Sequence, residues 1–166
     1  MTESVEHRLL RTFNFKVELS TSGGASLGDG GFQECSGLEV EMDVQELIEG
    51  GRNDGVIRRV GRAKYQNIVL KRGIFYNEGY VVNTELWKWM QQIVSGVVPV
   101  SRHDGKIHVY EPYHDGKEVR ATWSFIRALP AKIRGPELNA KTGEIAIEEL
   151  HLAHEGLRLE LGEEGS

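Results

Sequence analysis

The 166-residue sequence has a single cysteine, Cys35, and no long apolar run. One thiol excludes a disulfide within the chain. No window approaches the roughly 20 apolar residues that cross a bilayer, and the first ten residues contain no apolar stretch of signal-peptide length. The net charge is −5, so the sequence has no excess of Lys and Arg, which general binding to nucleic acid or anionic membranes needs. We therefore expect a globular protein that is made in the cytoplasm and does not bind membranes itself.

The sequence also lacks the residue spacings of common catalytic and metal sites. Gly28 and Gly30 lie in a glycine-rich stretch without the Gly-Lys-Ser/Thr of a phosphate-binding loop. His151 and His154 are three apart in a segment typical of a strand, which places them on opposite faces, whereas a zincin motif needs two histidines four apart on a helix. We therefore predict no catalytic residue, no metal, no cofactor and no enzymatic activity, which favours a structural or binding role.

The most regular pattern is a strict alternation of apolar and polar residues near the first third of the chain. The apolar positions are Leu38, Val40, Met42 and Val44, and the polar ones are Glu39, Glu41, Asp43 and Gln45. Period two is typical of a strand, and carboxylates about 7 Å apart on one face are tolerable only in water. Burial of each apolar side chain contributes about 1.5 to 3 kcal/mol. The pattern predicts a strand with one face in the core and one acidic face in water.

The rest of the chain is predicted to be mainly β with one helix. Alternating segments are expected at residues 13–19, 56–72, 106–111, 118–127, 144–150 and 152–161, and the inward face of 56–72 stays open. Loops are expected at 20–31 and 50–55. A helix over 84–95 has its apolar stripe at Leu86, Trp89, Met90, Ile93 and Val94. The pattern indicates one domain over 1–166, a β-barrel or sandwich closed by the helix, with a flexible arm at 1–11.

Four segments resemble the tail-tube proteins of contractile phage tails and related contractile injection systems. They are FQECSGLEVEMDVQE from Phe32, NIVLKRGIF from Asn67, ELWKWMQQIVSG from Glu85, and the C-terminal half from Trp123 to Leu157. The resemblance implies two packed antiparallel sheets with one flanking helix. It also implies hexameric rings that stack into the hollow inner tube of a virion or of a released or cell-anchored phage-tail-like particle.

The resemblance further implies partners and residue roles. Expected partners are other copies of the chain, the contractile sheath protein, baseplate or hub and tail-terminator proteins, and cargo or DNA in the lumen. Lumen candidates are Glu39, Glu41 and Asp43. Inter-ring loop candidates are Gly50, Gly51, Arg52, Asn53, Asp54 and Gly55, and sheath-facing candidates are Glu85, Lys88, Gln91 and Gln92. The alternative is a tube initiator, adaptor or secreted ring protein of the same fold that binds cargo.

Overall fold

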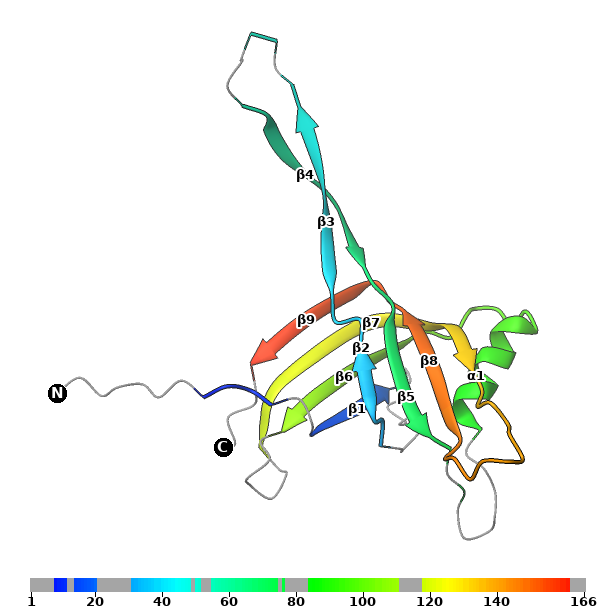
Figure 1. The fold of residues 1–166 in the computed structure, drawn as a ribbon. Helices are drawn as coiled ribbons and strands as arrows, with labels where there is room; N and C mark the ends of the chain where they lie inside the picture. The colour runs from blue at the N-terminus through cyan, green and yellow to red at the C-terminus, as the bar shows by residue number, and fades with distance from the viewer. Residues whose placement is uncertain are drawn as a thin grey trace, which may run out of the picture.

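The computed structural model describes residues 8–11, 14–20, 31–48, 50–51, 55–74, 76, 84–110 and 118–161. The elements in chain order are β1 (Phe15–Ser20), β2 (Glu34–Ser36), β3 (Val40–Leu47), β4 (Ile57–Tyr65), β5 (Ile68–Gly73), α1 (Glu85–Val94), β6 (His103–Tyr110), β7 (Val119–Arg134), β8 (Ile147–Ala153) and β9 (Gly156–Leu161). All strand pairs are antiparallel. The predicted mainly β fold of two antiparallel sheets with one helix is confirmed (Figure 1).

The long strand β7 belongs to both layers of the body. Its first part pairs with β6 and β9, and its last part pairs with β8, so one layer runs β1-β6-β7-β9 and the other β7-β8-β5-β2. The change of partner occurs at Arg127, whose φ of 51° is in the left-handed region. The Arg127 backbone N–H donates to Asp104 Oδ1 at 2.8 Å, which supports this uncommon conformation. The two layers therefore fold toward each other around one continuous strand.

The core lies between these layers and is formed by inward positions of β1, β5, β6, β7 and β8, by helix α1 and by Phe32 just before β2. Its buried residues are Val17, Leu19, Phe32, Ile68, Leu70, Leu86, Trp89, Ile107, Phe125, Ala128, Leu150 and Leu152. The sequence left open which face of the predicted strand 56–72 points inward. In β5, Ile68 and Leu70 point inward. That predicted strand is in fact two strands, because β4 leaves the body and only β5 joins the sheet.

Pro130 does not end the strand that contains it. The alternation predicted a strand over 118–127 that stops before this proline, but β7 continues to Arg134. The register with β8 shifts between Pro130 and Lys132, and a strand tolerates proline at such a bulge because no ladder N–H is needed there. The longer β7 is what joins the two layers.

Helix α1 packs beside the C-terminal part of β7 (Figure 1). Leu86 and Trp89 are buried as predicted, and the Trp89 Nε1–H donates to the Ser101 carbonyl oxygen at 2.9 Å. Val94 was predicted to belong to the apolar stripe, but it is 79% exposed because the helix ends there, beyond the packed surface. In the described part of the chain, no helix is long and apolar enough to cross a membrane.

Candidate functional site: a projecting hairpin

Strands β3 and β4 form a hairpin that projects far from the body (Figure 1). They pair from Val40 opposite Tyr65 to Leu47 opposite Ile57. The predicted burial of the apolar face in the chain's own core is wrong, because Val40, Met42 and Val44 are 53%, 43% and 58% exposed. Only Leu38, which precedes β3, packs against the core. The alternation is real, but no second layer in the described part of the chain covers these three side chains.

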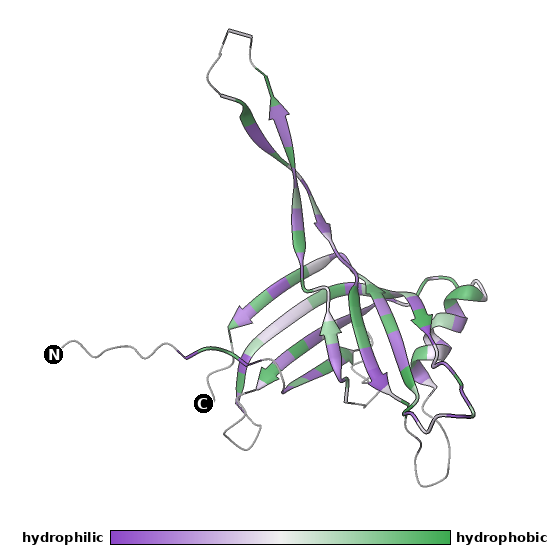
Figure 2. Cartoon of the chain, in the orientation of Figure 1, coloured by the Kyte–Doolittle hydropathy of each residue, from purple (hydrophilic) through white to green (hydrophobic). Residues whose placement is uncertain are grey.

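A bulge in β4 keeps the apolar residues on one side of the hairpin. Met42 lies opposite Ala63, and the next apolar pair is Val44 with Val60, so β4 has one residue more than β3 in this interval. Gly61 lies at the bulge, where a Cβ would come within 2.8 Å of the Asp43 carbonyl oxygen. Figure 2 shows apolar and polar residues alternating along both strands. The result is a continuous apolar hairpin face, defined here as Val40, Met42, Val44, Val60, Ala63 and Tyr65.

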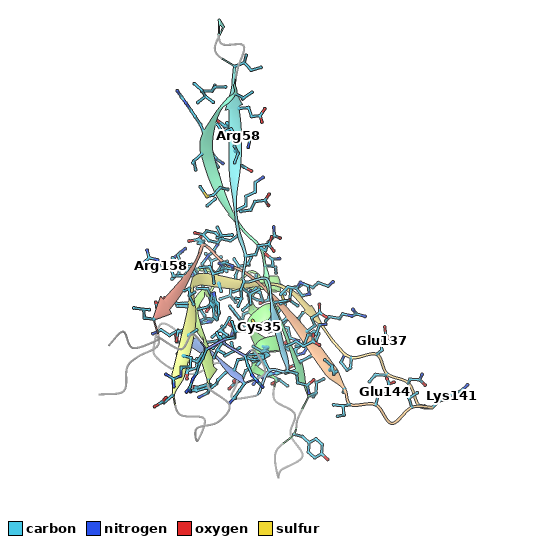
Figure 3. All side chains as sticks on the ribbon, turned by 60° about the vertical axis from the view of Figure 1, so that its left-hand side comes forward. Cys35, Arg58, Glu137, Lys141, Glu144 and Arg158 are labelled. Atoms are coloured by element: carbon cyan, nitrogen blue, oxygen red, sulfur yellow. The ribbon has the colours of Figure 1, made fainter. Side chains whose placement is uncertain are left out.

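The carboxylates of β3 lie beside the basic side chains of β4. Lys64 Nζ is 2.9 Å from Asp43 Oδ1, and this contact is the largest cause of a raised Lys64 pKa, to which Glu41 also contributes. At the far end of the hairpin, Arg58 Nε is 3.8 Å from Glu46 Oε1 (Arg58 is labelled in Figure 3). The acidic residues Glu39, Glu41, Asp43 and Glu46 are therefore matched in number by Arg58, Arg59, Arg62 and Lys64.

This charge pairing was missed at the sequence level, although a signal for it exists. The expected loop 50–55 lies between an acidic and a basic alternating segment, and a hairpin connection would place the two segments side by side. Of the inter-ring candidates, Gly50, Gly51 and Gly55 lie between the end of β3 at Leu47 and the start of β4 at Ile57. Arg52, Asn53 and Asp54 lie outside the described residues.

The helix offers a second exposed surface, well separated from the tip of the hairpin (Figure 1). Its predicted polar residues Glu85, Lys88, Gln91 and Gln92 are all exposed. A polar cluster connects the helix to the body. The Trp87 Nε1–H of α1 donates to Glu148 Oε2 of β8 at 3.1 Å, and Glu148 also accepts from Arg72 Nε in a buried ion pair. The Arg72 guanidinium also lies 5.5 Å from the centre of the Phe32 ring.

Several other chemically reactive side chains in the described residues are engaged in packing or hydrogen bonds. His151 Nε2 bonds to Glu149 Oε1, and His154 lies between two backbone carbonyl oxygens. Burial raises the pKa of the Cys35 thiol to about 11. Among the residues that the structure describes, no three His, Cys, Asp or Glu side chains are grouped as a metal site.

A two-layered β body with an exposed apolar hairpin face is typical of a protein that contacts other protein chains. The sequence matches the family described as T4-like virus tail tube protein gp19 over residues 11–158, so the chain belongs to this tail-tube family and is a structural tube subunit. No curated protein matches the sequence significantly.

Solved structures confirm the fold. A chain of the PVC sheath–tube complex, an extracellular contractile injection system in the extended state, aligns with a TM-score of 0.74 at 24% identity, covering 95% of this chain and 94% of that one. A chain of the anti-feeding prophage tube-terminating cap gives a TM-score of 0.74 at 21% identity, with 96% of each chain covered. The Hcp protein gives 0.52 at 12% identity, covering 92% and 94%. At these identities, the likeness establishes the shared fold.

Proposed function

We propose that this chain forms hexameric rings that stack into the inner tube of a contractile phage-tail-like particle. The observation that carries the proposal is the apolar hairpin face, on which Val40, Met42, Val44 and Val60 are exposed. A two-stranded hairpin is at best marginally stable alone in water, and exposed apolar area of this kind marks a contact with another protein. Other copies of the chain supply that contact when rings stack.

Free strand edges support closure of the ring by the same chain. In the described residues, β1, β2 and β9 each pair with one strand and keep the other edge open. Open edges bind further strands, and a heterologous contact repeated around a rotation axis closes a ring. Gly50, Gly51 and Gly55, which lie between the end of β3 and the start of β4, then reach the adjacent ring.

Glu39, Glu41 and Asp43 contribute to the lumen wall in this proposal. Their charges act on passing DNA or acidic cargo only within the Debye length, about 8 Å at physiological salt. Lys64 beside Asp43 weakens that repulsion, so the wall is of mixed charge rather than uniformly acidic. Cargo of either charge sign therefore meets a wetted surface with little net attraction.

The exposed face of α1, with Glu85, Lys88, Gln91 and Gln92, turns toward the contractile sheath. Similar folds occur in structures described as a sheath–tube complex, a baseplate and a sheath/tube terminator, which supports the sheath, the baseplate or hub and the tail terminator as partners. Assembly takes place in the bacterial cytoplasm, and the finished particle is a virion or a related injection system.

Negative-stain images of the purified chain test the tube proposal. Long tubes of constant diameter are the expected result. Isolated rings that never elongate would instead favour the tube-initiator or secreted-ring alternative, and a monomer that turns over a substrate would refute both.

The lumen assignment is tested with a triple variant, Glu39→Lys, Glu41→Lys and Asp43→Lys, in assembled particles. We expect rings to form while cargo loading or passage falls, because the added cations bind anionic cargo. A matched control changes Glu118, Glu137 and Glu144 to Lys, which alters the net charge equally on exposed sites of the body; Glu137 and Glu144 are seen on their loop in Figure 3. Unchanged delivery by the first variant would refute the assignment.

A further inference from the structure

The apolar hairpin face ends before the hairpin itself does. After the pair formed by Val44 and Val60, the next residues on the same side are Glu46 and Arg58, because successive residues of a strand point to opposite faces. Arg58 Nε lies 3.8 Å from Glu46 Oε1, so an ion pair takes the place of the apolar side chains here. The two faces of the hairpin therefore change character near its tip.

The last paired residues lie on the other face of the hairpin, and they are apolar. Leu47 is opposite Ile57 and shares the face of Gln45, two positions before it. Ile48 and Val56 flank this pair and are 88% and 49% exposed, and the alternation places them on the opposite face. Figure 2 shows hydrophobic residues where both strands approach the tip. The hairpin tip cluster, defined as Leu47, Ile48, Val56 and Ile57, thus presents apolar side chains on both faces.

This change of pattern indicates a change in how the hairpin is covered. A strand with one covered face alternates between apolar and polar residues, whereas a strand covered on both faces has consecutive apolar residues. Residues 40–45 follow the first pattern, and the pairs 47–48 and 56–57 follow the second. The tip lies far from the body of its own chain (Figure 1). The middle of the hairpin is therefore suited to lie on one surface, and the tip to enter between two surfaces of other chains.

Strand β9 carries an exposed apolar surface that suits the tip. Leu157 lies opposite Phe125 of β7, and residues opposite each other share a face of the sheet. Phe125 is fully buried, so this is the core face of the layer. Leu159 and Leu161 follow on the same face by alternation, yet they are 63% and 94% exposed. The core face of the layer thus continues along β9 into an exposed leucine pair, Leu159 and Leu161.

The direction of stacking brings the tip and the leucine pair to the same place. Identical rings that stack without reversal join the hairpin side of one copy to the opposite side of the next. In Figure 1, β9 begins near the root of the hairpin and ends away from it. The exposed apolar residues Leu138 and Ile145, by contrast, are seven positions apart on the segment between β7 and β8 and form no strand surface.

We propose that the hairpin tip cluster inserts into the next ring, with one face on the leucine pair of a copy there and the other face against the adjacent copy of that ring. This contact rests on the proposed function, because it exists only between stacked rings. The polar face around Gln45 stays in water, since the second covered face begins only at Leu47. Elongation of the tube therefore depends on Leu159 and Leu161, and formation of a single ring does not.

Cross-linking in assembled tubes tests which surface the tip meets. The full-length chain carries Ile48→Cys and Leu161→Cys, and its tubes are treated with a short bis-maleimide at pH 7. The native thiol contributes little, because burial raises the pKa of Cys35 to about 11. We expect a ladder of linked chains on a denaturing gel, since each copy supplies one tip and one β9 position. The matched control pairs Ile48→Cys with Leu138→Cys, whose native leucine is 89% exposed, and should give no ladder. Equal or stronger linkage in the control, or none in the β9 variant, overturns the proposal.

Four single substitutions test whether the tip is covered on both faces. Val44→Glu, Gln45→Glu, Leu47→Glu and Ile48→Glu each add one carboxylate to β3 or its end. Rings are measured by size-exclusion chromatography and elongation by pelleting. We expect Gln45→Glu to elongate normally and the other three to lose more than about tenfold in the association constant for elongation, because a carboxylate is costly in an apolar contact. Leu47 and Gln45 share a face, so normal elongation of Leu47→Glu overturns the two-sided contact.

Failure of this contact and failure of the proposed function give different results. If the unmodified chain forms no tubes, the proposed function fails and this contact fails with it. If the unmodified chain forms tubes while the β9 variant gives no ladder, only the contact is refuted and the tube remains.

Discussion

Glu148→Ala is expected to destabilise the subunit strongly, because it breaks the buried Arg72–Glu148 ion pair and removes the counter-ion of a buried guanidinium. Arg72 and Glu148 are cross-strand neighbours on β5 and β8 and are only 1% and 5% exposed. Removing the carboxylate leaves the guanidinium in the core without the counter-ion it now bonds, and it also deprives the Trp87 Nε1–H of its acceptor. Breaking a buried pair in this way typically costs about 3 to 5 kcal/mol.

That cost is large against the 5 to 15 kcal/mol that usually separates folded from unfolded domains. Urea unfolding of the isolated subunit at pH 7, followed by tryptophan fluorescence, measures the change in free energy of unfolding. The matched surface control is Glu118→Ala, which breaks the exposed pair with Arg120 at 2.7 Å and is expected to cost less than about 1 kcal/mol.

A double variant separates two quantities: the net contribution of the ion pair to stability, and the cost of leaving the buried Arg72 guanidinium without its counter-ion. Arg72→Met with Glu148→Leu replaces both ions by apolar groups of similar length, and such replacements are often neutral or stabilising. We expect the double variant to recover most of the stability lost in Glu148→Ala. A loss below about 1 kcal/mol in Glu148→Ala, or a double variant less stable than the single one, would refute the reasoning.

Three further predictions concern single positions in the body. Gly105→Ala should cost about 1 to 3 kcal/mol in urea unfolding, because its Cβ would meet the Phe125 ring at 2.1 Å; an unchanged midpoint contradicts this. Burial raises the Cys35 pKa to about 11, so iodoacetamide at pH 8 should alkylate the folded chain about a hundredfold more slowly than the urea-unfolded chain, and equal rates would disprove it. Burial lowers the His103 pKa below its usual 6.5, so the unfolded chain binds the proton more readily and stability falls as the pH drops below that value. His103→Gln should reduce this acid loss between pH 7.5 and 5.0, and a variant with the same slope as the unmodified chain contradicts the assignment.

Local periodicity predicted the elements well where one chain segment alone sets the pattern. The helix predicted over 84–95 is observed as Glu85–Val94, since its 3.6-residue period and flanking residues are local properties. The prediction that the strand stops before Pro130 was wrong, because local periodicity contains no information on the partner strand. Only the partner strand decides whether the missing N–H of Pro130 matters. The ends of the last two strands also moved, from 144–150 and 152–161 to Ile147–Ala153 and Gly156–Leu161, since strand ends depend on pairing.

By itself, the sequence determined that Val40, Met42 and Val44 form the apolar side of a strand, and it carried the resemblance that the family match confirms. Only the tertiary structure decided that this side faces outward on a hairpin, that its carboxylates lie beside Lys64 and Arg58, and that His154 meets Gln66 across 88 residues of chain. Alternation is a property of consecutive residues. Whether the apolar side of the strand is covered, and by which surface, depends on contacts between distant segments, and the periodicity of the sequence does not specify those contacts.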